Sequence, residues 1–327
     1  MPKPVVIVTE GSEPAPLAWL KERADVREVG PDDPGFGEAL AEAEGMVVRS
    51  YTKVTAELLA RSPKLRVVGR GGVGLESVDV AACRARGVEV VYTPDANTRA
   101  VIEFVFGLAI KLVRPWHANE LDFTPDGFKR LRKDAGEHLS DLTLGILGMG
   151  RVGRGVARAA HHGFGMRVRY HDLIDVANQV EVPAEAVDFR TLLTGCDLLT
   201  LHVDGRPGNR HLIDAGALAE ARFRWLINTS RGLVVDPTAV YTAIAAGRLE
   251  GVALDVFEPE PPPADSAYRR LAEAFPQRVL LTPHMASRTK PAIENMSWVV
   301  RDVVAVLRGE QPRSPAPAVG ADGGPIR

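Results

Sequence analysis

The sequence has few cysteines, no excess of one charge and no long apolar run. Cys83 and Cys196 are its only cysteines and show no metal-ligand spacing, so a reduced, cytoplasmic setting fits better than a disulfide framework. Forty basic residues nearly balance 42 acidic ones, which argues against a nucleic-acid or membrane partner. The N-terminal apolar run is too short for a signal-peptide core, and Glu103 and Lys111 interrupt the most hydrophobic helix candidate, so no segment is expected to span a membrane.

The remaining composition is that of a globular protein. Of 327 residues, 45% are hydrophobic and 25% charged. This length favours two domains, each large enough to bury its own core.

Residues 1 to about 99 alternate short valine-rich runs with polar–apolar stretches that suit helices. The expected strands are Val5–Thr9, Gly45–Arg49, Leu65–Gly69 and Val88–Tyr92, and the expected helices are 16–23, 36–43, 55–60 and 78–86. Such alternation predicts a parallel sheet with helices on both faces.

A second series of strands and helices follows a long helix expected at 98–114. Residues 115–138 between them show no clear period, and we hypothesise that they pack on a second subunit. The expected strands of the second series are 143–147, 167–170, 198–202, 225–228, 251–255 and 279–281. One long helix is expected at 289–308 and a disordered tail, rich in Pro, Gly and Ala, at 311–327.

The strongest motif follows the first strand of this second series. Leu144–Leu147 leads into Gly148-x-Gly150-x-x-Gly153, a helix-like run comes next, and Asp172 ends a second strand 19 residues after Gly153. In a dinucleotide site the three glycines allow a tight turn, approach to a pyrophosphate and close helix packing, and the acid binds a ribose. The helix N-terminus adds amides and a positive dipole end. The stretch therefore predicts a dinucleotide site rather than an ordinary glycine turn.

Three later strands also end in polar residues. Arg231 follows one beside a glycine, an acidic, proline-rich segment at 255–261 follows the next, and His284 follows the last. Taken singly, each is more often a surface or turn residue, but ligands bind at the carboxyl ends of parallel strands. The combination predicts a functional site, with the substrate in a cleft between the domains.

With these motifs the chain resembles the D-isomer-specific 2-hydroxyacid dehydrogenases, and within them the phosphoglycerate dehydrogenase branch. The resemblance covers about residues 45 to 308. It is carried by Val48-Arg49-Ser50, the segment 67–74, the nucleotide fingerprint, Asn228-Thr229-Ser230-Arg231-Gly232, Ala253 to Phe257 and Thr282-Pro283-His284.

The resemblance implies two doubly wound α/β domains of Rossmann and flavodoxin-like type, with an NAD-binding domain (100–286) inserted into a substrate domain (1–99 and 287–310). It also implies catalytic roles for Arg231, Glu260 and His284. The implied cofactor contacts are Gly148, Gly150, Arg151, Val152, Gly153, Asp172, His202, Thr229 and Asp255. The implied substrate contacts are Arg49, Ser50, Arg70, Gly72, Val73 and Gly74.

The chemistry suits these roles. Histidine exchanges protons near neutral pH, and Glu260 beside His284 would favour the protonated imidazole. Arg231 could clamp a carboxylate through two hydrogen bonds. The glycine-rich loop at 71–74 offers N–H groups to a carboxylate or phosphate. Arg49 matches a phosphate-binding position in the phosphoglycerate branch, although a surface ion pair explains it about as well.

Some positions depart from the family pattern. Glu76-Ser77 replaces Asp followed by Asn or His, Asp204 replaces a proline, and Ala286 replaces a glycine. With these departures, the family pattern does not identify a single substrate. No regulatory domain follows the last helix, so feedback control is not expected.

We therefore predict an NAD-dependent enzyme that transfers a hydride between nicotinamide and C2 of a small D-2-hydroxy or 2-keto acid, with a phosphoglycerate-like substrate favoured. Asp172 favours NAD because its charge would repel the 2′-phosphate of NADP. One alternative is a reductase of glyoxylate, hydroxypyruvate or a phosphonate-type keto acid. Another, of a different class, is an NAD(H)-sensing, corepressor-like binding protein. A cytoplasmic homodimer is expected.

Overall fold

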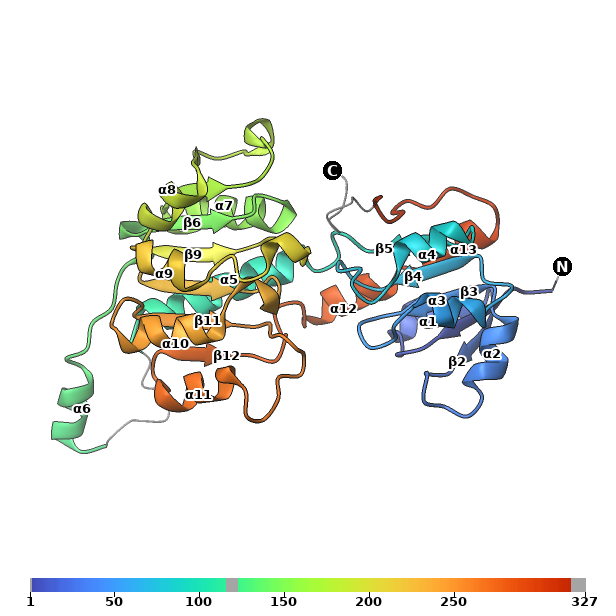
Figure 1. Ribbon diagram of the computed structural model, residues 1–327, viewed down its shortest axis with the longest axis horizontal. Coiled ribbons are helices and arrows are strands. Elements are labelled where there is room, and N and C mark those ends of the chain that lie inside the picture. Colours follow the sequence, from blue (N-terminus) through green and yellow to red (C-terminus); the bar gives the residue numbers. More distant parts are fainter. Residues whose placement is uncertain (1, 116–122, 319–327) are drawn as a thin grey trace. The chain divides into compact units, whose positions relative to one another are not determined.

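The computed structural model describes residues 2–115 and 123–318, and the chain divides into two compact units. One unit is formed by Met1–Asn97 and Ser287–Arg327, and the other by Thr98–Ala286. Each unit is built on a parallel sheet with helices on both faces (Figure 1). The predicted fold class, two doubly wound domains with one inserted into the other, is confirmed.

The first unit has a five-stranded sheet in the order β2-β1-β3-β4-β5. Its strands are β1 (Val5–Val8), β2 (Asp25–Glu28), β3 (Gly45–Val48), β4 (Val67–Arg70) and β5 (Glu89–Tyr92). Its helices are α1 (Pro14–Lys21), α2 (Phe36–Glu42), α3 (Ala56–Ala60), α4 (Val80–Ala85), α12 (Lys290–Ser297) and α13 (Val300–Leu307). Side chains of α2, α3 and α4 pack into the core on one face, and those of α1 and α13 into the core on the other.

The second unit has a seven-stranded sheet in the order β12-β11-β10-β9-β6-β7-β8. Its strands are β6 (Thr143–Leu147), β7 (Arg167–His171), β8 (Glu185–Ala186), β9 (Leu198–Leu201), β10 (Trp225–Asn228), β11 (Gly251–Leu254) and β12 (Val279–Leu281). Its helices are α5 (Thr98–Val113), α6 (Pro125–Leu131), α7 (Arg151–Phe164), α8 (Phe189–Thr194), α9 (Ala215–Glu220), α10 (Pro237–Ala245) and α11 (Ala267–Ala274).

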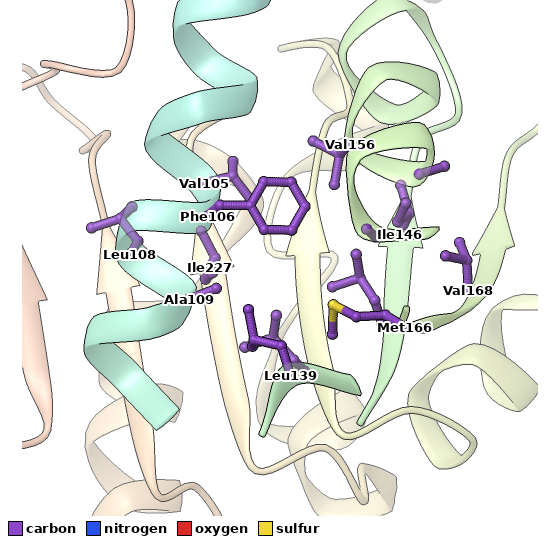
Figure 2. Close-up of a cluster of buried hydrophobic side chains, with 14 of the residues drawn as sticks. Val105, Phe106, Leu108, Ala109, Leu139, Ile146, Val156, Met166, Val168 and Ile227 are labelled. Carbon is purple, nitrogen blue, oxygen red and sulfur yellow. The ribbon is translucent and has the colours of Figure 1, made fainter. Parts of the chain in front are cut away.

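Apolar packing holds helices on both faces of this sheet. Figure 2 shows one face, where Phe106 and Ala109 of α5 lie near Val156 of α7 and near Ile146 and Ile227 of the sheet. Helices α8 to α11 pack on the other face. The strand order reverses between β6 and β9, so the carboxyl ends of these two strands form the switch point where doubly wound sheets bind ligands.

The helix expected at 289–308 is instead two helices. Between α12 and α13 the N–H groups of Val299, Arg301 and Asp302 donate three residues back rather than four. The Ser297 hydroxyl donates to Ile293 O at 3.0 Å and accepts the Glu13 N–H at 3.2 Å. A side chain that competes with the helical hydrogen bonds, and a tightened turn, explain the break.

The disordered tail expected at 311–327 is wrong for residues 311–318. The Arg313 and Ser314 N–H groups donate to the Asp302 carboxylate at 3.0 and 3.1 Å. Pro315 forms an antiparallel bridge with Val91 of β5, and Ala316 is buried. Backbone pairing with an open sheet edge thus orders a segment whose composition shows no period. Residues 319–327 lie outside the described part of the chain.

Strand β2 and helix α6 carry too little apolar pattern to be predicted, and the two-residue strand β8 is too short. Strand β2 reads Asp-Val-Arg-Glu and lies at the edge of its sheet, where no side is fully buried. Helix α6 lies in the 115–138 segment and begins at Pro125, after the N-cap residue Thr124, whose side chain accepts the Gly127 N–H. Residues 116–122 of that segment lie outside the described residues.

Candidate active site

The nucleotide fingerprint lies at the switch point, between β6 and α7. Gly148 has φ +93°, and a Cβ there would lie 2.6 Å from His202 O at the end of β9. A Cβ on Gly153 would lie 2.2 Å from Gly148 O, so helix and loop touch without side chains between them. A Cβ on Gly150 would meet nothing within 4 Å, which leaves open space beside the N-terminus of α7. This is the arrangement that suits a pyrophosphate.

Asp172 follows β7 and lies beside this loop. Its carboxylate accepts the Met149 N–H at 2.8 Å and the Ile174 N–H at 3.3 Å. Leu173 and Ile174, next to it, are exposed large apolar residues. An acid fixed at the second strand end is in the place that a ribose requires.

Two further residues predicted to contact the cofactor are polar and enclosed. Burial lowers the pKa of His202 to about 3, so its ring is neutral at physiological pH, and its Nε2 lies 3.0 Å from the Thr200 hydroxyl. The Thr229 hydroxyl is buried and has no hydrogen-bond partner among the described residues. A buried hydroxyl without a partner is costly unless a ligand supplies one. These residues therefore fit a bound dinucleotide.

The loop after β10 carries Arg231. Asn228 holds this loop, because its side chain accepts the Ser230 N–H at 3.0 Å and donates to Arg231 O at 2.9 Å. A Cβ on Gly232 would lie 2.0 Å from the carbonyl carbon of Phe257. The backbone after β10 is thus in direct contact with the loop after β11, which carries Glu260.

Asp255 directly follows β11 and holds the loop of the predicted catalytic histidine. It is fully buried, and its carboxylate accepts the Thr282 hydroxyl at 2.6 Å and the N–H groups of Met285 and Ala286 at 2.7 and 2.9 Å. Burial raises the pKa of Asp255, and these hydrogen bonds only partly oppose it. A cofactor contact of Asp255 stays a prediction.

The structure brings Glu260 and His284 together. Their Oε2 and Nδ1 atoms are 2.8 Å apart, and Glu260 Oε1 accepts the Phe257 N–H at 2.9 Å. Burial raises the pKa of Glu260, but the hydrogen bonds of His284 and Phe257 and the charge of Arg231 bring it below its ordinary value. Glu260 is therefore ionised at neutral pH and can accept a hydrogen bond from His284 Nδ1.

His284 is held in an uncommon backbone conformation. Its φ is +54°, and its N–H donates to Asp255 O at 2.8 Å and Thr282 O at 2.9 Å. Its side chain is 50% exposed. A residue other than glycine keeps a left-handed conformation only where neighbouring contacts enforce it. Such residues are common at functional sites.

In the first unit, the segment after β4 contacts the Arg70 side chain. Gly72 has φ +146°, and a Cβ there would lie 1.3 Å from Arg70 Nη1, which also donates to Gly71 O at 3.0 Å. Any other residue at position 72 would be strained at this φ and would displace the Arg70 guanidinium. Val73 and Gly74 follow, half-buried, and their predicted substrate contacts stay a prediction.

Arg49, at the end of β3, lies over the same segment. Its Cγ is 3.7 Å from the position of a Cβ on Gly71. Burial and the charge of Arg288 lower the pKa of Arg49, whereas the charges of Glu10 and Glu13 oppose the shift. Two neighbouring guanidinium groups repel one another, and a bound anion would relieve this repulsion.

A comparison with known families decides the identity. The model described as "D-isomer specific 2-hydroxyacid dehydrogenase, NAD binding domain" matches residues 106–286, more than half of the chain. The chain belongs to the D-isomer-specific 2-hydroxyacid dehydrogenases. The inserted unit is the NAD-binding domain of this family, and its cofactor is NAD.

Three relatives illustrate the range of the family. D-3-phosphoglycerate dehydrogenase of Mycobacterium tuberculosis is 34% identical over 313 residues, which cover 95% of this chain and 58% of that protein. Hydroxypyruvate reductase of Thermotoga maritima is 32% identical over 281 residues, which cover 86% of this chain and 90% of that protein. The crystal structure of D-lactate dehydrogenase of Aquifex aeolicus, complexed with NAD and lactic acid, is 28% identical with a TM-score of 0.80 and covers 94% of this chain and 96% of that chain.

The chain spans less than two thirds of the length of its phosphoglycerate dehydrogenase relatives, 58% of the M. tuberculosis protein. None of the described helices of this family member is long and apolar enough to cross a membrane.

The departures of this chain from the family pattern have local structural roles. Asp204 forms an ion pair with Arg206 at 2.7 Å and accepts the Asn209 amide at 3.1 Å. The Ala286 N–H donates to Asp255, and the Ser77 hydroxyl donates to Arg49 O at 3.2 Å.

Sequence reasoning missed one polar residue near the predicted substrate loop. Glu10 follows β1 and accepts backbone N–H groups of the segment that begins at Arg49. Its position directly after a buried strand is the signal that could have revealed it, as with the other strand-end residues.

Proposed function

We propose that the protein is an NAD-dependent D-2-hydroxyacid dehydrogenase that interconverts a small 2-hydroxy acid and its 2-keto acid, with a distal anionic group on the substrate. The observation that carries this proposal is the 2.8 Å contact between His284 Nδ1 and Glu260, on a loop in contact with that of Arg231. A proton donor with its orienting acid, beside an arginine, is what keto-acid reduction requires.

The reaction divides between cofactor and side chains. When bound, NAD exchanges a hydride with C2 of the substrate. In reduction, His284 gives a proton from Nε2 to the oxygen on C2, while Nδ1 stays hydrogen-bonded to Glu260. In oxidation, the neutral ring takes this proton back. Arg231 binds the C1 carboxylate through two N–H groups and so orients C2.

Glu260 should matter because its carboxylate accepts a hydrogen bond from His284 Nδ1 and orients the ring. Glu260→Gln should lower kcat for 2-keto acid reduction about 10- to 100-fold, because the amide is a weaker, uncharged partner of the proton donor. Initial rates of NADH oxidation test this. The matched control is Glu258→Gln, since Glu258 lies on the same loop as Glu260 but pairs with Arg210. An unchanged kcat in Glu260→Gln would count against the role.

Arg49 and the segment at 70–74 are proposed to bind the substrate, and Arg49 its distal anionic group. Arg49→Gln should lower kcat/KM about 10- to 100-fold for a 2-keto acid with a distal phosphate, and less than about threefold for glyoxylate, which lacks one. Initial rates of NADH oxidation with both acids measure this, and Arg49→Lys, which keeps the charge, serves as control.

Equal losses with the two acids would instead favour a reductase of glyoxylate or hydroxypyruvate, in line with the relative named hydroxypyruvate reductase. Tight NADH binding without turnover of any keto acid would favour a binding protein that senses NAD(H).

We also propose that the protein acts in the cytoplasm as a homodimer. Both cysteines are free thiols, which supports a reducing compartment. Phe123 is 91% exposed and Phe128, on α6, is 47% exposed, which supports a partner surface on this segment. The molar mass in solution, measured by light scattering, tests the dimer.

A further inference from the structure

The Glu10 carboxylate is surrounded by four consecutive backbone N–H groups. Oε1 accepts those of Arg49 and Thr52 at 3.1 and 2.7 Å, and Oε2 accepts those of Ser50 and Tyr51 at 2.8 and 2.9 Å. Each oxygen therefore takes two bonds. Successive N–H groups that converge in this way form a concave anion site, and here the chain fills the site with its own carboxylate.

The sheet explains how Glu10 reaches this segment. Strands β1 and β3 are parallel neighbours, with Val8 paired to Val47, so both chains leave the sheet at the same edge. The Thr9 N–H donates to Val47 O at 3.1 Å, and the hydroxyls of Thr9 and Thr52 are 2.7 Å apart. Glu10 thus sits next to the segment 49–52, although 39 residues separate it from Arg49.

Glu10 is ionised under working conditions. Burial raises the pKa of Glu10, but the N–H groups of Tyr51, Thr52 and Arg49 and the Thr52 hydroxyl outweigh it and bring this pKa below its ordinary value. Hydrogen bonds to a charged group are stronger than those between neutral groups. The carboxylate is therefore a strong restraint on the segment.

Side-chain packing supports this segment mainly at Thr52, which is 1% exposed, and little at the two residues before it. Ser50 is exposed, and Tyr51 is 87% exposed. Arg49 is half-buried, and its carbonyl accepts the Ser77 hydroxyl. The bonds to Glu10 thus restrain the backbone from which the Arg49 side chain leaves.

We propose that Glu10 is a positioning residue for substrate recognition: by binding the N–H groups of 49–52, it pre-orients Arg49 for the distal anionic group of the keto acid. This inference rests on the proposed function. Pre-orientation lowers the entropy lost on binding, so it acts on KM for substrates that use Arg49.

The chain offers a matched control for charge. Glu13, like Glu10, interacts electrostatically with the Arg49 guanidinium. The backbone N–H groups of 49–52, however, donate their hydrogen bonds to Glu10. Glu10→Gln removes a charge and leaves an amide that cannot accept four N–H bonds, whereas Glu13→Gln removes only a charge. Glu10→Asp keeps the charge on a shorter side chain and should recover part of the effect.

We expect Glu10→Gln to raise KM for a phosphate-bearing 2-keto acid about tenfold, with kcat within about twofold and KM for glyoxylate nearly unchanged. Glu13→Gln should change KM less than about threefold. In an Arg49→Gln background, Glu10→Gln should add almost nothing, because both changes remove the same interaction.

A loss of kcat equal for both acids, or full additivity with Arg49→Gln, would overturn the proposal. Amide hydrogen exchange provides a readout that does not need turnover. Faster exchange at 49–52 in Glu10→Gln but not in Glu13→Gln supports the positioning role, and unchanged exchange overturns it. If the parent protein reduces no 2-keto acid, the proposed function fails, while exchange still decides whether Glu10 positions the segment.

Discussion

Replacing His284 by alanine should lower kcat for reduction of a 2-keto acid about 100- to 10,000-fold, the range that general acid catalysis contributes. His284 is the group whose Nδ1 is bonded to Glu260 at 2.8 Å, which leaves Nε2 to carry the transferred proton. The affinity for NADH should stay within about twofold, because the fingerprint loop and Asp172 are unchanged. Steady-state kinetics and fluorescence titration of NADH measure the two effects.

His284→Asn is the control for the backbone at this position. His284 has φ +54°, a conformation that asparagine tolerates better than alanine does. A fall in kcat of similar size in both variants would assign the loss to the missing proton donor. Turnover that persists in either variant would contradict the role of His284.

The second large effect is expected at Arg231. Arg231→Gln should lower kcat/KM about 100- to 10,000-fold. Removing the bidentate, charged partner of a bound carboxylate weakens transition-state binding by about 3–5 kcal/mol. Arg231→Lys should recover only part of this loss, since an ammonium cannot form the two parallel bonds.

Two comparisons identify the carboxylate as the group that Arg231 binds. A keto-acid methyl ester, which lacks the carboxylate charge, should react poorly with the parent and lose little more with Arg231→Gln. Arg210→Gln removes a cation that pairs with Glu258 instead, and should leave kcat/KM nearly unchanged. An equal loss with acid and ester would point to another role, such as the effect of the Arg231 charge on Glu260.

Local patterns were sufficient for much of the fold. Strand–loop–helix order, three glycines at fixed spacing and an acid after the next strand predicted the dinucleotide site, and the structure has β6, α7 and β7 at those places. These features depend on residues within about one βαβ unit, where backbone sterics and helix dipoles act over short distances.

Two predictions were wrong because the structure at those places depends on contacts outside the local sequence pattern. Residues 289–308 have an unbroken apolar period, yet Ser297 bonds to the distant Glu13 N–H and the helix is divided. Residues 311–318 have no period, yet Ser314 and Ala316 pair with the backbone of β5. Composition does not indicate which sheet edge is free to accept a segment.

By itself, therefore, the sequence determined the two parallel-sheet domains, the dinucleotide loop and the types of residue that end the strands. The tertiary structure decided which of these residues meet. Glu260 and His284 are 24 residues apart and share a hydrogen bond because β11 and β12 are neighbours in the sheet. Glu10 holds the segment at Arg49 because β1 and β3 are neighbours. The physical reason is the same in both cases: side-chain contacts between distant segments follow strand order and register, which depend on the packing of the whole sheet.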